Sequence, residues 1–190
     1  MRLLAAVLLA AAFAVQASAA KPSRYKVASV TGGVLTADGK AVAAEGELSE
    51  GAKVRLDKGK AVLELGDEGR LMLTGPAEIK LGKREVGLVS GALLSVLPRL
   101  RGNFSVSTPL AVAAVRGTEF FLEVREDGRT YLCLCEGALE VSAAPGLSLR
   151  KTMLRSKHHG SYIYSKIGKR VDRGPWRMEN HSDAEIGGLK

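Results

Sequence analysis

The sequence has few aromatic residues and almost no cysteine. Its 190 residues include four Phe, four Tyr and one Trp, against 22 Gly. This ratio argues against an aromatic-rich core or a stacking platform and favours many tight turns between short elements. Two cysteines cannot cross-link a domain of this size. Hydrophobic residues make up 46% of the chain and charged residues 25%, so the composition fits one globular domain and excludes disorder throughout.

The motifs of the common enzyme classes are missing as well. The sequence contains no H-E-x-x-H, G-x-S-x-G or G-x-G-x-x-G pattern, which would indicate zinc proteases, α/β-hydrolases or dinucleotide-binding domains. Its three histidines, His158, His159 and His181, all lie in a poorly patterned C-terminal region, where a rigid catalytic geometry is difficult to build. We therefore expect a protein that is not an enzyme.

Only one long apolar run is present, at the amino terminus. Arg2 precedes an apolar stretch over residues 3–15, and residues 17–19 read Ala-Ser-Ala. The charge, the length and the small-residue cleavage site are those of a secretory signal peptide. Gln16 and Ser18 interrupt the run before it reaches the ~20 residues that a membrane-spanning helix needs. We predict a cleavable signal peptide over residues 1–20 and a periplasmic or secreted mature chain without a transmembrane helix.

The formal net charge of the chain is +8. Export removes nucleic acid as an everyday partner, so the charge indicates affinity for anionic lipid headgroups, an acidic envelope polymer or an acidic protein. Much of the charge is local, because residues 151–190 hold nine Lys or Arg and four Asp or Glu. We predict that residues 150–190 form a basic, partly irregular tail, an electrostatic arm with Trp176 as its aromatic anchor.

Residues 27–149 alternate between short apolar runs and glycine-centred turns. The runs at residues 53–56 and 104–107 have period-two alternation, as expected for strands with one buried face. Turn signals lie between the runs at Asp38-Gly39, Thr74-Gly75-Pro76, Ser90-Gly91 and Asp127-Gly128. These features predict an all-β domain over residues 27–149, an antiparallel β-sandwich or β-roll of many short strands. A β-solenoid is the alternative, because regularly spaced glycine turns would suit it too.

One arginine stands out within the predicted strands. Pro109 ends a strand because it cannot donate to a ladder, and residues 110–115 form a small-residue apolar stretch that requires close burial. Arg116, with Gly117 and Thr118, then interrupts the apolar pattern before the next strand begins. An arginine between buried flanks needs acceptors. We expect Glu119 or strand-end carbonyls to provide them.

The same region resembles the FecR-domain proteins of the bacterial envelope. The matching pattern is V-x-T-P at residues 106–109, V-R-G-T-E-F at residues 115–120, a D-G turn at residues 127–128 and E-G at residues 136–137. An upstream L-x-x-G-x-L lead-in also fits, and together the similarity spans about residues 27–143.

The resemblance implies an exported β-module that binds or scaffolds. Full-length family members that relay siderophore signals resemble membrane-crossing anti-sigma regulators, with a cytoplasmic helical segment, one transmembrane helix and a periplasmic β-domain. This sequence has the predicted signal peptide where those parts would be, so we expect a stand-alone module that does not contact a cytoplasmic sigma factor. Arg116, Gly117, Thr118 and Glu119 are then a structural turn and the candidate partner-facing motif.

Cys133 and Cys135 support an alternative. They lie two positions apart in an apolar run, so an extended backbone places both thiols on one face and the neighbouring leucines on the other. Such positions are ~6.5 Å apart and their side chains run parallel, which disfavours a disulfide. The thiols are either small buried hydrophobic groups or ligands that join His158 and His159 in a site for zinc, copper or haem iron. Unpaired thiols are unusual in an oxidising compartment, which keeps the metal interpretation open.

The sequence thus favours a non-catalytic, exported binding module without a cofactor. Its expected partner is a periplasmic or outer-membrane protein, or an acidic cell-wall polymer, in signalling or in envelope assembly. The alternative is a metal- or haem-binding periplasmic protein that uses Cys133, Cys135, His158 and His159.

Overall fold

A computed structural model of the chain describes residues 25–98 and 102–190. These residues form fifteen strands and one short helix, which confirms the all-β prediction. The predicted signal peptide lies outside the described residues. In chain order the elements are β1 (Tyr25–Thr31), β2 (Leu35–Ala37), β3 (Lys40–Ala41), β4 (Glu47–Leu48), β5 (Lys53–Leu56), β6 (Lys60–Leu65), β7 (Arg70–Leu81), β8 (Glu85–Leu97), β9 (Phe104–Ser107), β10 (Ala111–Val115), β11 (Thr118–Val124), β12 (Thr130–Ala143), β13 (Thr152–Ser156), β14 (Gly160–Ile167), β15 (Arg170–Pro175) and α1 (Asp183–Leu189).

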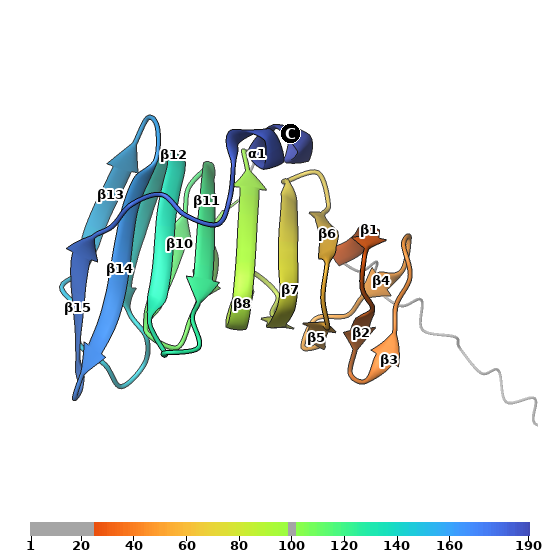
Figure 1. The fold of residues 1–190 in the computed structure, drawn as a ribbon, viewed down its shortest axis with the longest axis horizontal. Coiled ribbons are helices and arrows are strands. Elements are labelled where there is room, and N and C mark those ends of the chain that lie inside the picture. Colours follow the sequence, from red (N-terminus) through yellow and green to blue (C-terminus); the bar gives the residue numbers. More distant parts are fainter. Residues whose placement is uncertain (1–24, 99–101) are drawn as a thin grey trace, which may run out of the picture.

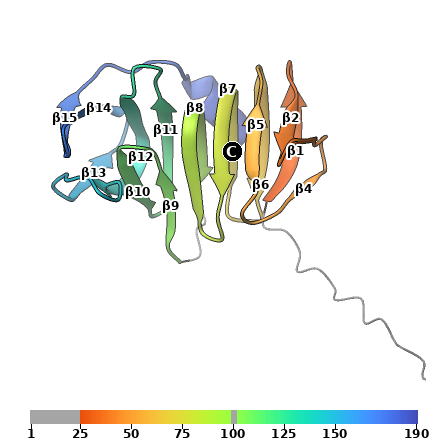
Figure 2. The same cartoon turned by 90° about the horizontal axis from the view of Figure 1, so that it is seen from below.

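Three long strands, β7, β8 and β12, divide the sheet into two layers, because each changes its partners halfway along. The first layer runs in the order β4, β1, β6, start of β7, end of β8, β11, start of β12, β14 and β15. The second layer runs β3, β2, β5, end of β7, start of β8, β9, β10, end of β12 and β13. Figure 1 shows β14, β12, β11, β8 and β7 of the first layer side by side, and in Figure 2 β9, β8, β7, β5 and β2 of the second layer follow one another from left to right. The long strands thus belong to both layers, as in packings where strands switch sheets through bends.

Pairing between the described strands is antiparallel, with the one exception of β8 and β9. A parallel β-solenoid needs parallel pairing from coil to coil, so the solenoid alternative is wrong. The predicted antiparallel sandwich or roll is the closer description.

Two predicted turns are instead bends within the long strands. Gly75 and Pro76 lie inside β7, and Ser90 and Gly91 lie inside β8, where the register between the two strands shifts. Gly91 has φ +80°, and a Cβ there would lie 2.3 Å from the carbonyl O of Pro76, so only glycine allows the strands to cross so closely. The sequence signal for an irregular backbone was right, but the chain bends between layers at these points instead of reversing.

The main core lies between the two layers. Alternate residues of the strands point into it, including Val54 and Leu56 of β5 and Phe104 and Val106 of β9, all at most 2% exposed. This confirms the period-two prediction for both strands. In the first layer the opposite face is buried as well, so β12 is buried at each position from Thr130 to Cys135, which explains why its sequence is a continuous apolar run.

The C-terminal segment, residues 176–190, covers that outer face. Figure 1 shows it crossing β14, β12 and β11 before α1 lies against β8 and β7. A second apolar cluster forms underneath, where Ile186 and Leu189 of α1 pack with Met72, Phe121 and Tyr131 of the sheet.

Residues 150–190, predicted to form a basic, partly irregular tail, are more ordered than expected. Strands β13, β14 and β15 continue both layers, and α1 follows them. Strands at the end of a sheet need few apolar residues. Tyr164 and Val171 are the buried residues that enter the main core from β14 and β15, and Tyr162 packs partly against it. For this reason the composition of residues 150–190 resembles that of solvated chain, although residues 152–156, 160–167 and 170–175 lie in paired strands.

Candidate functional site

Three segments bring the side chains of Cys133, Cys135, His159 and His181 together on the outer face of the first layer. The cysteines lie on β12, His159 in the turn between β13 and β14, and His181 just before α1. Their four donor atoms all lie within 4.8 Å of one another. Both thiols are buried and both imidazoles are half-buried, so the cluster, which we call the Cys/His cluster, is largely shielded from solvent.

Each thiol faces one imidazole. The Sγ atom of Cys133 lies 3.4 Å from Nδ1 of His159, and the Sγ atom of Cys135 lies 3.4 Å from Nε2 of His181. The backbone N–H of His159 donates to the carbonyl O of Cys135 at 3.1 Å, which holds the β13–β14 turn against β12. The two cysteines are free, and they face the outer cluster while Leu132 and Leu134 face the main core. Both predictions, the shared face and the absence of a disulfide between them, are confirmed.

Further acceptors fix the orientation of both rings. Nε2 of His159 lies 2.7 Å from Oδ1 of Asp183, and Nδ1 of His181 lies 2.8 Å from the carbonyl O of Glu179. The His159 imidazole holds the pKa of the Asp183 carboxyl below its usual value, so this carboxylate accepts. Because these outer ring nitrogens donate, the inner nitrogen of each ring faces a thiol, and it accepts a proton in the neutral ring or donates to a thiolate in the protonated ring. Phe121 stacks on His181 with ring centroids 4.6 Å apart.

The two thiols influence each other's protonation. Hydrogen bonds, first from Cys135 and then from the two histidines and Ser161, hold the pKa of Cys133 below the usual value of a thiol, although burial acts in the opposite direction. The interaction with Cys133, together with burial, raises the pKa of Cys135. The pair therefore favours one thiolate, the form that reacts with electrophiles and binds metal ions.

Sequence reasoning placed His158 in this group and omitted His181. The structure brings Cys133, Cys135 and His159 together, but His158 is exposed and lies outside this cluster. Its ring meets the His159 ring with centroids 4.4 Å apart, and its donor atom lies within 4.8 Å of those of His159 and Asp183 in a second, more exposed group. A signal for His181 was present. Residues 182–185 read S-D-A-E, and Ser182 and Glu185 form a capping box at the start of α1, which would have predicted a helix directly after His181.

The family-like motif residues mainly shape the bend of β12. Gly137 has φ +105°, and a Cβ there would lie 2.7 Å from Cγ2 of Thr118 and 2.8 Å from the carbonyl O of Gly117. The R-G-T and E-G parts of the motif therefore contact each other. Thr118 is 2% exposed, and Glu119 forms an ion pair of 2.8 Å with Lys190.

The expectation that Arg116 meets Glu119 or a strand-end carbonyl was wrong. Its side chain is exposed, and within residues 25–98 and 102–190 it forms neither an ion pair nor a side-chain hydrogen bond. The turn at Gly117, with φ +63°, directs the arginine to solvent instead of between the buried flanks. Of the four motif residues, Arg116 is thus the one that is free to contact a partner.

The basic residues of β13 to β15 and their turns are exposed. Arg150, Arg155, Lys157, Lys166, Lys169 and Arg173 form no ion pair with the described residues. We call this group the basic end. Trp176 is 37% exposed, and its ring lies beside the guanidinium groups of Arg125 and Arg129, 5.7 and 5.6 Å from its centroid. The expected aromatic anchor is therefore packed against the β11–β12 hairpin instead of lying on a free arm.

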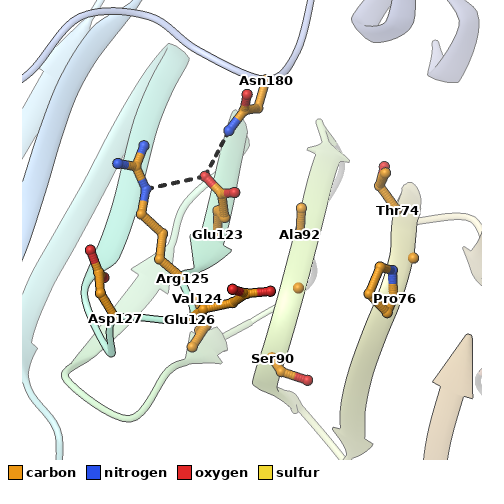
Figure 3. A pocket seen from close by; sticks show the side chains of 12 residues that line it. Thr74, Pro76, Ser90, Ala92, Glu123, Val124, Arg125, Glu126, Asp127 and Asn180 are labelled. Atoms are coloured by element: carbon orange, nitrogen blue, oxygen red, sulfur yellow. Dashed lines mark hydrogen bonds and ion pairs between the residues drawn. The ribbon is translucent and has the colours of Figure 1, made fainter. Parts of the chain in front are cut away.

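A hollow of about 900 Å³ lies between the bends of β7 and β8 and the β11–β12 turn (Figure 3). Its polar groups interact with one another: the Asn180 amide donates to Glu123 at 2.9 Å, and Arg125 lies 3.4 Å from the same carboxylate. Asp127 is bound by Arg129 outside the hollow. Among the residues that line it, no nucleophile is paired with a general base.

Comparison with known proteins agrees with this fold. Residues 52–140 match the family model described as FecR protein. No curated protein matches the chain. A solved structure from Parabacteroides distasonis, assigned as an anti-sigma factor, is similar with a TM-score of 0.51 at 17% sequence identity, over 65% of this chain and 59% of that one. At this identity the likeness concerns the fold, and the chain spans about three fifths of the length of that protein.

Within residues 25–98 and 102–190, no helix has the length and apolar character needed to cross a bilayer. The family match covers both halves of β7 and β8 and most of β12, the strands that link the two layers. It also includes the contact between the R-G-T and E-G parts of the motif. Residues 52–140 therefore match the FecR family, and we refer to this matched region as the FecR domain.

Proposed function

We propose that this protein is a non-catalytic binding module of the bacterial envelope, and that its partner is another envelope protein with an acidic surface. The proposal builds on the FecR domain, whose family consists of envelope-associated, non-enzymatic regulators. A signalling role follows from the same match. The mature chain acts in the periplasm, as the predicted signal peptide indicates.

The observation that carries the proposal is the basic end. Its six exposed cations extend over β13, β14, β15 and their turns, and none is neutralised by an ion pair with the described residues. Because these strands are held in the sheet, the cations form a rigid charged surface and not a mobile arm. Fixed charges of one sign accelerate association with an acidic partner and give it a salt dependence.

Charge reversal tests the proposal. The variant Lys166→Glu, Lys169→Glu, Arg173→Glu should lose most of its capture of the partner from a crosslinked envelope fraction, and the capture by the native chain should weaken with added salt. A matched control with the same change of net charge is Lys40→Glu, Lys58→Glu, Lys80→Glu, at exposed positions outside the basic end. Unchanged capture by the first variant, or equal loss in both, would contradict the proposal, and recovery of an acidic cell-wall polymer alone would replace the protein partner.

A further inference from the structure

We propose that the Cys/His cluster is a tetrahedral zinc site in which Cys133, Cys135, His159 and His181 are the four ligands. Nothing in the proposed binding function requires this site, so the two proposals stand independently.

The spacing of the donor atoms fits the ion. Zinc binds thiolate sulfur at ~2.3 Å and imidazole nitrogen at ~2.0–2.1 Å in tetrahedral geometry, which separates sulfur and nitrogen ligands by about 3.6 Å and the two sulfurs by about 3.8 Å. The two sulfur–nitrogen distances in the structure are both 3.4 Å, and no pair of donor atoms is more than 4.8 Å apart. Small side-chain rotations around a central ion complete the tetrahedron.

The rings are oriented as in protein zinc sites. A ligating histidine typically donates its other ring N–H to a carboxylate or a backbone carbonyl. His159 has the first arrangement, with Asp183 at 2.7 Å, and His181 has the second, with the carbonyl O of Glu179 at 2.8 Å. Two independent outer contacts thus direct the inner nitrogens, Nδ1 of His159 and Nε2 of His181, to a common point.

The same geometry argues against haem and favours zinc over the other ions. A haem iron places its two axial ligands on opposite sides, about 4 Å apart, with the macrocycle between them. Four donor atoms that all lie within 4.8 Å of one another, two of them from the same strand, leave no room for a macrocycle between any two of them. A closed set of two sulfurs and two nitrogens is typical of structural zinc.

The place of the Cys/His cluster in the fold indicates what a bound zinc ion would do. The cluster joins β12, the β13–β14 turn and the C-terminal segment, three segments that are distant in sequence. The C-terminal segment is also attached by the packing of Ile186 and Leu189, by the largely buried Arg125–Glu179 ion pair and by the hydrogen bond from the Glu179 N–H to the Tyr131 hydroxyl. Its more exposed ion pairs, such as Lys60–Glu185, are individually weak. Zinc would hold this segment over the outer apolar cluster and keep the two thiols from oxidation.

Metal analysis and cobalt substitution of the full chain, purified under argon without chelators, test the site. We expect one zinc per chain and, after exchange with Co²⁺, thiolate-to-cobalt charge-transfer bands with strong tetrahedral d–d bands. His181→Ala and Cys135→Ser should abolish both signals, whereas His158→Ala, the adjacent exposed histidine, should keep them. Asp183→Asn leaves all four ligands in place and should weaken zinc binding about 10–100-fold.

Asp183 is exposed, so its variant should fold normally, as circular dichroism would verify. Removal of zinc should increase amide exchange in residues 176–190 and leave the strands of the main core protected. The site is refuted if the argon-purified chain contains no zinc and takes up no Co²⁺, if the bands are those of six-coordinate oxygen ligation, or if His158→Ala loses metal as His181→Ala does.

Discussion

At the scale of single residues, the glycines at the bends have the clearest structural role. Gly137 and Gly128 both have positive φ, +105° and +79°, but they differ in surroundings. A Cβ at Gly137 would collide with Thr118 and with the backbone of Gly117, whereas at Gly128 nothing lies within 4 Å. Substitutions at these two glycines therefore separate the energetic cost of the steric clash at the bend from the cost of a left-handed backbone.

We expect Gly137→Ala to lower the free energy of unfolding by about 2–4 kcal/mol, since clash and backbone strain add. The control Gly128→Ala should lower it by about 1 kcal/mol, from the backbone alone. Urea denaturation of both variants measures the difference. Equal effects would show that the contact between the two parts of the FecR motif does not stabilise the bend of β12.

Among the elements, α1 shows how a short helix is retained on a sheet. Its capping box supplies the first-turn acceptors, Ile186 and Leu189 pack on the outer cluster, and Lys60 of β6 pairs with Glu185 at 2.5 Å. The hydrogen bond from Lys60 lowers the pKa of the Glu185 carboxyl below its ordinary value of 4.5. The pair therefore stabilises the docked helix above pH 4.5, and this stabilisation is lost as the pH falls through the lowered pKa.

Replacement of Glu185 by Gln tests this pH dependence. Gln still accepts in the capping box but loses the attraction to Lys60, so α1 should exchange its amides up to about 5-fold faster than in the native chain at neutral pH, an effect of less than about 1 kcal/mol for an exposed pair. The ratio of the exchange rate in the variant to that in the native chain should approach one at acidic pH, where Glu185 itself is protonated. A control is Glu50→Gln, an exposed acid outside any ion pair in the described part of the chain. A ratio that does not change with pH would contradict the assignment.

The elements also show what a sequence can reveal. Period-two runs predicted β5 and β9, and the position of Cys133 and Cys135 on one face followed from strand geometry alone. The bends at Gly75-Pro76 and Ser90-Gly91 were recognised as irregular but interpreted as turns, because a glycine signal does not distinguish a reversal from a change of layer. Strands β13 to β15 were missed, since their stability comes from neighbours distant in the sequence and not from their own hydrophobicity.

The same limit applied to the candidate site. His159 lies 24 residues from Cys135 and His181 lies 46 residues from it, and neither spacing matches a short metal-binding motif. The correct set became visible only when β14 paired with β12 and the C-terminal segment crossed the outer face of the first layer. His158 and His159, adjacent in sequence, point to different surroundings because the turn assigns φ +45° to His159.

At the scale of the whole molecule, the two layers and the C-terminal segment have different roles. The FecR domain provides a rigid two-layered frame, the basic end presents fixed positive charge, and the Cys/His cluster fastens the last fifteen residues, 176–190, across the outer face. The C-terminal region completes the fold and brings one of the four ligands, so the FecR domain and the segment after it form one structural unit.

X-ray absorption at the zinc edge of the purified full chain tests the central claim most directly. The account predicts a four-coordinate shell with two sulfur atoms at about 2.3 Å and two nitrogen atoms at about 2.0 Å from the ion in the native chain, and loss of the bound zinc in His181→Ala. A shell of oxygen atoms only, or one that is identical in the native chain and in His181→Ala, would contradict it.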